Sequence, residues 1–168
     1  MLINFFASEL QQTSKRKRFG ICDSQPPPHI PAFLDEKDGG KWIAIVINEY
    51  QLEILFIPID NCIELRREDG KMDNRCDGLL SYSPSTVIFI ELKKRTDGNA
   101  WIKEGDNQLR QTIKHFERTE EAISFTTKRA YIANSKKPKF RINQTGRMEQ
   151  FHRDTGYILR IENRIIIE

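Results

Sequence analysis

The chain has 168 residues, of which 38% are hydrophobic and 30% are charged, a composition typical of a folded domain with its own core. No apolar run reaches the roughly 20 residues of a transmembrane helix, and the opening MLINFF lacks the basic start of a secretion signal. Three cysteines without CxxC spacing argue against a disulfide framework or a cysteine zinc site. We therefore expect a cytoplasmic protein with packed free thiols and no membrane contact.

The net charge of +3 is unevenly distributed along the chain. Residues 126–168 contain ten Lys and Arg against four Asp and Glu, a local charge of +6, which leaves 17 against 20, or −3, in residues 1–125. A basic C-terminal third beside an acidic remainder suits a protein that binds phosphates near a carboxylate site. On charge alone, however, a solvated basic face is the favoured interpretation.

The first half of the chain predicts a helix followed by strands. Apolar residues recur at roughly helical spacing in residues 1–12, and a basic and proline-rich loop follows up to residue 40. Residues 41–48 and 52–59 are rich in β-branched and aromatic side chains, and the short polar connection between them predicts an antiparallel hairpin. Residues 62–66 are a candidate third strand.

The second half predicts strands interrupted by two helices. The sum is a single α/β domain with a central mixed β-sheet flanked by helices. Residues 1–40, the N-terminal helix and the Pro-rich basic loop, are either part of this core or appended to it, and residues 41–168 form the main domain. The predicted elements are strands at 75–82 and 86–93, a helix at 99–118, a strand at 128–133, a helix at 144–153 stopped by Gly156, and strands at 157–161 and 164–167.

The strand at residues 86–93 carries the residues with chemical potential. It is apolar on both faces and therefore predicted to be central in the sheet, yet it ends with Glu91 and Lys93 on one face. Asp77 lies on the preceding strand, and antiparallel pairing brings it beside Glu91. Buried charges are costly unless they are paired or hold a metal. Two carboxylates and the backbone carbonyl of Leu92 form an oxygen site suited to Mg²⁺ or Mn²⁺, and Lys93 can orient water or stabilise transition-state charge. A solvent-facing salt bridge on an edge strand is the structural alternative.

Asp77, followed by Glu91-Leu92-Lys93 after a hydrophobic strand, resembles the motif of the PD-(D/E)xK nuclease superfamily. The resemblance covers roughly residues 42–133. It implies a restriction-endonuclease-like core and a Mg²⁺-dependent nuclease that hydrolyses phosphodiester bonds of nucleic acid, with DNA the expected substrate, in defence or repair. Many such families add a glutamine on the next helix, which corresponds to Gln108, with Gln111 the weaker alternative.

The chain departs from the pattern of this superfamily in two places. Cys76 stands where the motif has proline. The further acidic residue that such families often take from a helix before the sheet has only two weak candidates here, Glu9 and Glu64.

Basic residues outside the motif are the candidates for contacts with nucleic acid. Sequence specificity is expected to be weak or supplied by a partner protein, and a homodimer would allow paired cuts. The alternative function is a non-catalytic nucleic-acid-binding or protein-interaction module that retains the nuclease fold. The candidate phosphate contacts are Lys94, Arg95, Lys136, Lys137, Lys139 and Arg141.

Overall fold

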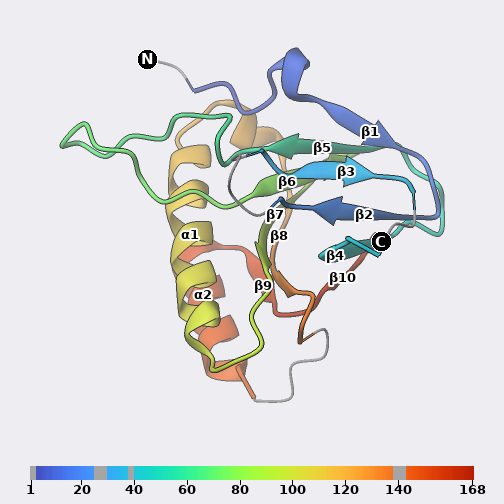
Figure 1. Ribbon diagram of the computed structural model, residues 1–168. Coiled ribbons are helices and arrows are strands. Elements are labelled where there is room, and N and C mark those ends of the chain that lie inside the picture. Colours follow the sequence, from blue (N-terminus) through green and yellow to red (C-terminus); the bar gives the residue numbers. More distant parts are fainter. Residues whose placement is uncertain (1–2, 25–29, 38–39, 138–142) are drawn as a thin grey trace.

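The chain folds around two mixed β-sheets, with two helices packed against the larger one (Figure 1). The structure is a computed structural model that describes residues 3–24, 30–37, 40–137 and 143–168. The larger sheet has the strand order β1-β5-β6-β7-β8-β9 and the smaller sheet the order β10-β4-β2-β3. The elements are η1 (Ser8–Leu10), β1 (Gln12–Ser14), β2 (Arg18–Cys22), β3 (Phe33–Asp35), β4 (Ala44–Ile47), β5 (Ile54–Pro58), β6 (Gly78–Tyr82), β7 (Thr86–Lys93), α1 (Ala100–Phe116), η2 (Glu121–Ser124), β8 (Thr127–Asn134), α2 (Thr145–Thr155), β9 (Ile158–Arg160) and β10 (Arg164–Ile166).

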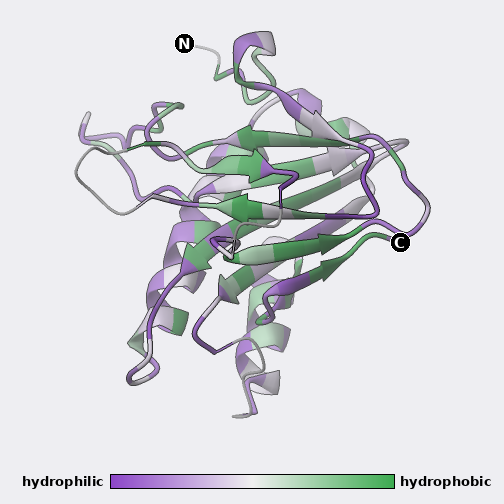
Figure 2. Ribbon diagram, turned by 45° about the vertical axis from the view of Figure 1, so that its right-hand side comes forward, coloured by the Kyte–Doolittle hydropathy of each residue, from purple (hydrophilic) through white to green (hydrophobic). Residues whose placement is uncertain are grey.

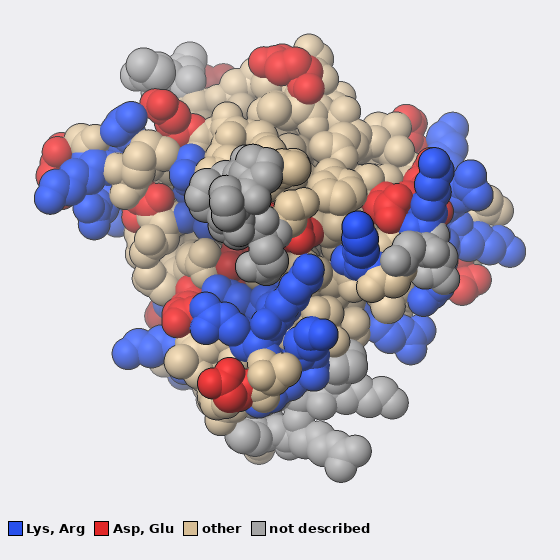
Figure 3. All heavy atoms as spheres, in the orientation of Figure 1, with Lys and Arg blue, Asp and Glu red and all other residues tan. Residues whose placement is uncertain are grey.

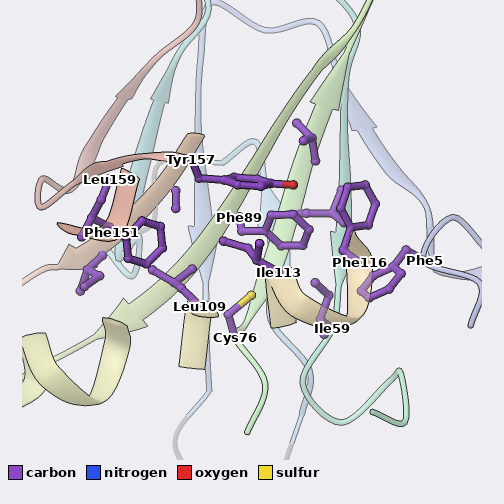
Figure 4. Packing of buried hydrophobic residues seen from close by; sticks show 14 of the residues in the cluster. Phe5, Ile59, Cys76, Phe89, Leu109, Ile113, Phe116, Phe151, Tyr157 and Leu159 are labelled. Carbon is purple, nitrogen blue, oxygen red and sulfur yellow. The ribbon is translucent and has the colours of Figure 1, made fainter. Parts of the chain in front are cut away.

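The larger sheet is the middle of three layers, and its helix-facing side forms one hydrophobic core. Val87 and Phe89 of β7 belong to the same buried cluster as Leu109 and Ile113 of α1 and Phe151 of α2 (Figure 4). The apolar residues of α1 recur every three or four positions, so they form one stripe that faces the sheet. Burial of each such side chain contributes about 1.5–3 kcal/mol, which fixes α1 against β7.

The opposite side of the larger sheet is covered by the smaller sheet. Ile88 and Ile90 of β7 pack in a second cluster with Phe19 of β2 and Val46 of β4, and Figure 2 shows that strands of both sheets are mostly hydrophobic. The predicted single α/β domain with a mixed sheet and helices is confirmed. The helices, however, flank only one face, because the smaller sheet occupies the other.

β7 and its neighbours match the predicted elements closely. β7 has the predicted bounds, is buried along seven of its eight residues, and lies between antiparallel β6 and parallel β8. Asn99 occupies the N-cap position of α1, although its side chain makes no capping hydrogen bond. Gly156 ends α2 with φ of 82°, a left-handed conformation that glycine adopts without steric cost.

The predicted hairpin between residues 41–48 and 52–59 is wrong. β4 pairs with β2 and β10 in the smaller sheet, whereas β5 pairs with β1 and β6 in the larger one. The side chain of Asn48 explains the change of sheet, because it bonds both the N–H and the C=O of Leu52 and turns the chain from one layer to the other. Two apolar segments joined by a short connection can thus face each other across a core instead of pairing.

The predicted N-terminal helix and the third strand are also wrong. In residues 3–12 only the short 3-10 turn η1 is helical. The segment after it forms β1, which pairs with β5, and Phe5 is buried in the helix-side core. Pairing and burial here outweigh a helical spacing of apolar residues. Residues 62–66 form no strand and make only an isolated bridge between Arg66 and Met72.

None of the helices in the described ranges has the length and apolar character that crossing a membrane requires.

Candidate active site

β7 carries Glu91 and Lys93 to the helix-facing side of the larger sheet, at the carboxyl end of the strand. Val87 and Phe89 point into the helix-side core, and the alternation of side chains along a strand places Glu91 and Lys93 in the same row. Glu91 is only 3% exposed, and its Oε2 lies 3.2 Å from Nζ of Lys93. The predicted placement of both residues on one buried face therefore matches the structure.

The prediction that Asp77 lies on the strand before β7 is wrong, because β6 begins only at Gly78 and Asp77 lies at a bend directly before it, beside the end of β7. Its N–H donates to the carbonyl of Ile90 at 3.1 Å, and its Oδ2 accepts the N–H of Leu92 at 2.7 Å. These two bonds orient the carboxyl group toward the end of β7. Asp77 and Glu91 lie close enough to share a hydrogen bond when one of them is protonated. The structure thus brings together the two carboxyl groups that the sequence pattern paired.

The electrostatics of the pair favour one bound proton or a cation. Burial, and then the charge of Asp23, raise the pKa of Asp77 to about 7, although hydrogen bonds from Leu92 and Glu91 oppose the rise. Burial, and then the charge of Asp77, raise the pKa of Glu91 well above its ordinary value despite the nearby Lys93. Among the described residues, Oε1 of Glu91 is the one buried side-chain oxygen or nitrogen without a hydrogen-bond partner.

Lys93 is held at the edge of the pair by the first helix. Its Nζ donates to Oε1 of Gln108 at 3.0 Å and lies 3.6 Å from the half-exposed carboxylate of Glu104. The amide nitrogen of Gln108 donates in turn to the carbonyl of Arg75 at 3.4 Å. Gln108, rather than Gln111, is therefore the glutamine of α1 that contacts the site.

The donor set fits a hard divalent cation. Leu92 turns its N–H toward Asp77, and because the N–H and C=O of a strand residue point the same way, its carbonyl lies on that side too. Two carboxylates and one carbonyl suit Mg²⁺, which keeps several water ligands, and the unpartnered Oε1 of Glu91 is an acceptor without a donor. No group of three or more Asp, Glu, His or Cys side chains in the described ranges is arranged to hold a metal.

Basic residues lie on the loops that follow β7 and β8. Asn134 joins these loops, since its side chain accepts from Arg95 N and donates to Arg95 O. Lys94, Arg95 and Lys136 are exposed, whereas Lys137 donates to the carbonyl of Gly98. Figure 3 shows Lys and Arg side chains in separate groups at the left, the centre and the right of the face drawn, with acidic side chains among them. Two further candidates, Lys139 and Arg141, lie outside the described residues.

Two acidic residues whose charge acts on Asp77, Asp23 and Asp60, were not predicted. Asp23 and Asp60 both raise the pKa of Asp77, and burial followed by the charge of Asp60 raises that of Asp23. Glu9 and Glu64 are exposed on the 3-10 turn and on the loop after β5. Asp23 directly follows the short apolar run Phe19–Cys22. That run could have indicated a strand, but it falls within the predicted loop.

The arrangement combines a buried carboxylate pair, a lysine at its edge and exposed cations nearby. Such a set can bind a divalent cation, hold a water molecule and attract a phosphate group. No family model, curated protein or solved structure compared with the chain matches it.

Proposed function

We propose that the chain is a Mg²⁺-dependent nuclease with a restriction-endonuclease-like core, as the resemblance of its motif implies. The observation that carries the proposal is the pair of Asp77 and Glu91, both less than 10% exposed and with one carboxylate oxygen of Glu91 left without a donor. A buried pair of carboxylates without sufficient positive charge is costly. A divalent cation removes that cost, and Mn²⁺ can replace Mg²⁺ in an oxygen site.

Each residue of the site has a defined part in phosphodiester hydrolysis. Asp77, Glu91 and the carbonyl of Leu92 would hold the cation, which when bound would supply Lewis-acid chemistry. The ammonium of Lys93 orients the attacking water or donates to the phosphate oxygens as negative charge develops. Gln108 keeps that ammonium in place through the 3.0 Å bond to its Oε1. Precise placement of such groups is itself a large part of catalysis.

The expected substrate is a polyanion that lies across the ends of β7 and β8. Lys94, Arg95 and Lys136 are exposed on the adjoining loops, where they can contact phosphates without reading bases. Nucleic acid, with DNA preferred by the resemblance, satisfies this requirement, and sequence specificity would come from a partner protein or a second copy of the chain.

The test is Mg²⁺-dependent cleavage of plasmid, linear and single-stranded DNA and of RNA by the wild type and Lys93→Ala. We expect the wild type to cut at least one substrate and EDTA to stop it. Loss of the ammonium should reduce cutting by about a hundredfold or more, as removal of one charge-stabilising donor does elsewhere. Lys114→Ala is the matched control, because Lys114 is an exposed lysine in the last turn of the same helix that carries Gln108.

The outcomes separate catalysis from the alternative function. Equal cutting by the wild type and Lys93→Ala would contradict the assigned site. A wild type that binds nucleic acid but cuts none of the substrates would favour the non-catalytic nucleic-acid-binding module.

A further inference from the structure

The pairing of strands in the sheet does not by itself determine the backbone conformation at Asp77. Its N–H donates to Ile90 of β7, but its carbonyl accepts from Ile59, which follows β5 on the other side. In a regular antiparallel strand both groups of a residue bond the same neighbour. The residue is accordingly a bend, and β6 begins only at Gly78. Something outside the sheet has to orient the peptide that carries this carboxylate.

That orientation comes from Thr112 in the C-terminal half of α1. The N–H of Cys76, the residue directly before Asp77, donates to Oγ1 of Thr112 at 2.8 Å. Figure 4 shows the Cys76 side chain beside Leu109 and Ile113 of the same helix. Thr112 and Cys76 are both fully buried, so water does not compete for this bond.

The direction of the threonine hydroxyl is also fixed. Oγ1 of Thr112 donates its proton to the carbonyl of Gln108 one turn earlier, at 2.9 Å. Its lone pairs are therefore left to accept the N–H of Cys76. A valine at this position would have the same shape and no acceptor, whereas a serine would keep the acceptor.

Thr112 is the central one of three contacts between α1 and the segment that leads to Asp77. Gln108 donates to the carbonyl of Arg75, and Nε2 of His115 lies 3.0 Å from a carboxylate oxygen of Asp73. Positions 108, 112 and 115 follow the i, i+4, i+7 spacing of one helix face. Since Gln108 also binds Lys93, a single face of α1 sets the positions of both the carboxylate and the ammonium.

We propose that Thr112 is a positioning residue that holds Asp77 against the end of β7, and that the geometry of the cation site depends on its hydroxyl. The inference rests on the proposed function for its catalytic consequence, but the orientation of Asp77 is observable without activity. The N–H of Leu92 donates to Oδ2 of Asp77, so the hydrogen exchange of that amide reports whether the carboxylate is in place.

The experiment compares Thr112→Val and Thr112→Ser with the wild type in the full chain. Thr155→Val is the matched control, because the Thr155 hydroxyl also donates to a carbonyl four residues earlier and accepts a backbone N–H, from Tyr157, at the far end of α2. Three quantities are measured: exchange of the Leu92 amide, Mn²⁺ affinity by electron paramagnetic resonance, and kcat and KM for DNA cleavage.

We expect Thr112→Val to accelerate exchange at Leu92 and to weaken Mn²⁺ binding or kcat by about ten- to a hundredfold, as loss of a supporting contact in a metal site does. KM should change little. Thr112→Ser should restore all three quantities, and Thr155→Val should leave them near wild type.

Two results overturn the inference: Thr112→Val with the Leu92 exchange and Mn²⁺ affinity of the wild type, or Thr155→Val with the same losses. A wild type that neither binds Mn²⁺ nor cuts DNA refutes the proposed nuclease. In that case exchange at Leu92 alone decides whether Thr112 holds Asp77.

Discussion

Two clusters of buried carboxylates among the described residues, one around Asp106 and one formed by Asp77 and Glu91, are compensated very differently. Asp106 of α1 is 5% exposed and is bonded by two arginines, Arg110 on its own helix and Arg147 of α2, the latter at 2.9 Å. Asp77 and Glu91 together have one ammonium nearby, that of Lys93. The first group is a structural ion cluster that joins α1 to α2.

The two clusters differ in how far positive charge neutralises their buried carboxylates. At the first cluster Arg110 and Arg147 both bond Asp106, and Arg110 also bonds the partly exposed Asp154, so two cations balance two carboxylates. At the other cluster two carboxylates face one lysine, the pKa of both acids is raised, and Oε1 of Glu91 has no donor. Functional sites often retain such unfavourable arrangements because a ligand or substrate relieves them.

The largest expected effect is that replacing a carboxylate by its amide has opposite consequences for stability and for cleavage at the two clusters. Glu91→Gln should reduce Mg²⁺-dependent cleavage by about a thousandfold, since loss of the cation removes several kcal/mol of transition-state stabilisation. Without metal at pH 8 the same change should raise the free energy of unfolding, because the raised pKa of the buried Glu91 means that its ionisation is disfavoured in the folded chain.

Asp106→Asn is the counterpart of that substitution. It leaves Arg147 and Arg110 without their buried partner, and since both arginines are partly exposed we expect a loss of about 2 kcal/mol in unfolding free energy, with cleavage retained. Urea unfolding of both variants measures whether each substitution raises or lowers the free energy of unfolding. Destabilisation by both would contradict the contrast between the clusters.

The next effect is a fall in stability with rising pH in metal-free buffer. The pKa of Asp77 is about 7 in the folded state against an ordinary 3.8, so between these values the folded chain holds a proton that the unfolded chain has released. The stabilisation that the proton on Asp77 contributes is therefore fully present below pH 4 and is lost as pH rises through 7. The total loss in unfolding free energy is on the order of a few kcal/mol.

Urea titrations between pH 4 and 8 on wild type and Asp77→Asn check this dependence. The variant should have the flatter profile, because an amide does not titrate. Saturating Mg²⁺ should also flatten the wild-type profile, since the cation competes with the proton for the same oxygens. Identical profiles for the wild type and the variant would contradict the raised pKa.

A smaller effect follows from direct binding of the cation. Mg²⁺ or Mn²⁺ at about a hundred times its dissociation constant should stabilise the wild type by about 2.7 kcal/mol, and EDTA should reverse the change. On adding metal, the melting temperature of Asp106→Asn should rise as much as that of the wild type, whereas that of Glu91→Gln should not rise. A rise in Glu91→Gln equal to that of wild type would place the cation elsewhere.

The segment that contains the site was predictable because it is local in the chain. Asp77, Glu91, Lys93 and Gln108 lie within 32 consecutive residues that form a strand, a tight turn, a strand and a helix. Alternation along β7 determines which side chains share a face, and a hairpin leaves one simple way to pair β6 with β7. Short-range rules were therefore sufficient for Glu91 and Lys93, whereas Asp77 lies at a bend before β6 that a contact with α1 helps to orient.

The errors concern pairings between distant parts of the chain. β4 and β5 are adjacent in sequence but belong to different sheets, and hydrophobic periodicity says that a strand is buried without naming its neighbour. Asp23 was missed for the same reason, because it approaches Asp77 only after the smaller sheet has packed on the larger one. Contacts between distant parts of the chain thus determine both the sheet to which β4 and β5 belong and the position of Asp23.

The smallest expected effect concerns the cations around the two clusters. Arg147 is bonded to Asp106, whereas Lys94 is exposed at the end of β7, where a phosphate can replace water around it. Lys94→Ala should weaken binding of duplex DNA at low salt and reduce the slope of log K against log[salt] by about 0.9. Lys114→Ala, at the far end of α1, should leave the slope unchanged. Fluorescence anisotropy between 50 and 200 mM salt measures both, in Ca²⁺ to prevent cutting. An unchanged slope for Lys94→Ala would remove this lysine from the substrate path while leaving the carboxylate site untouched.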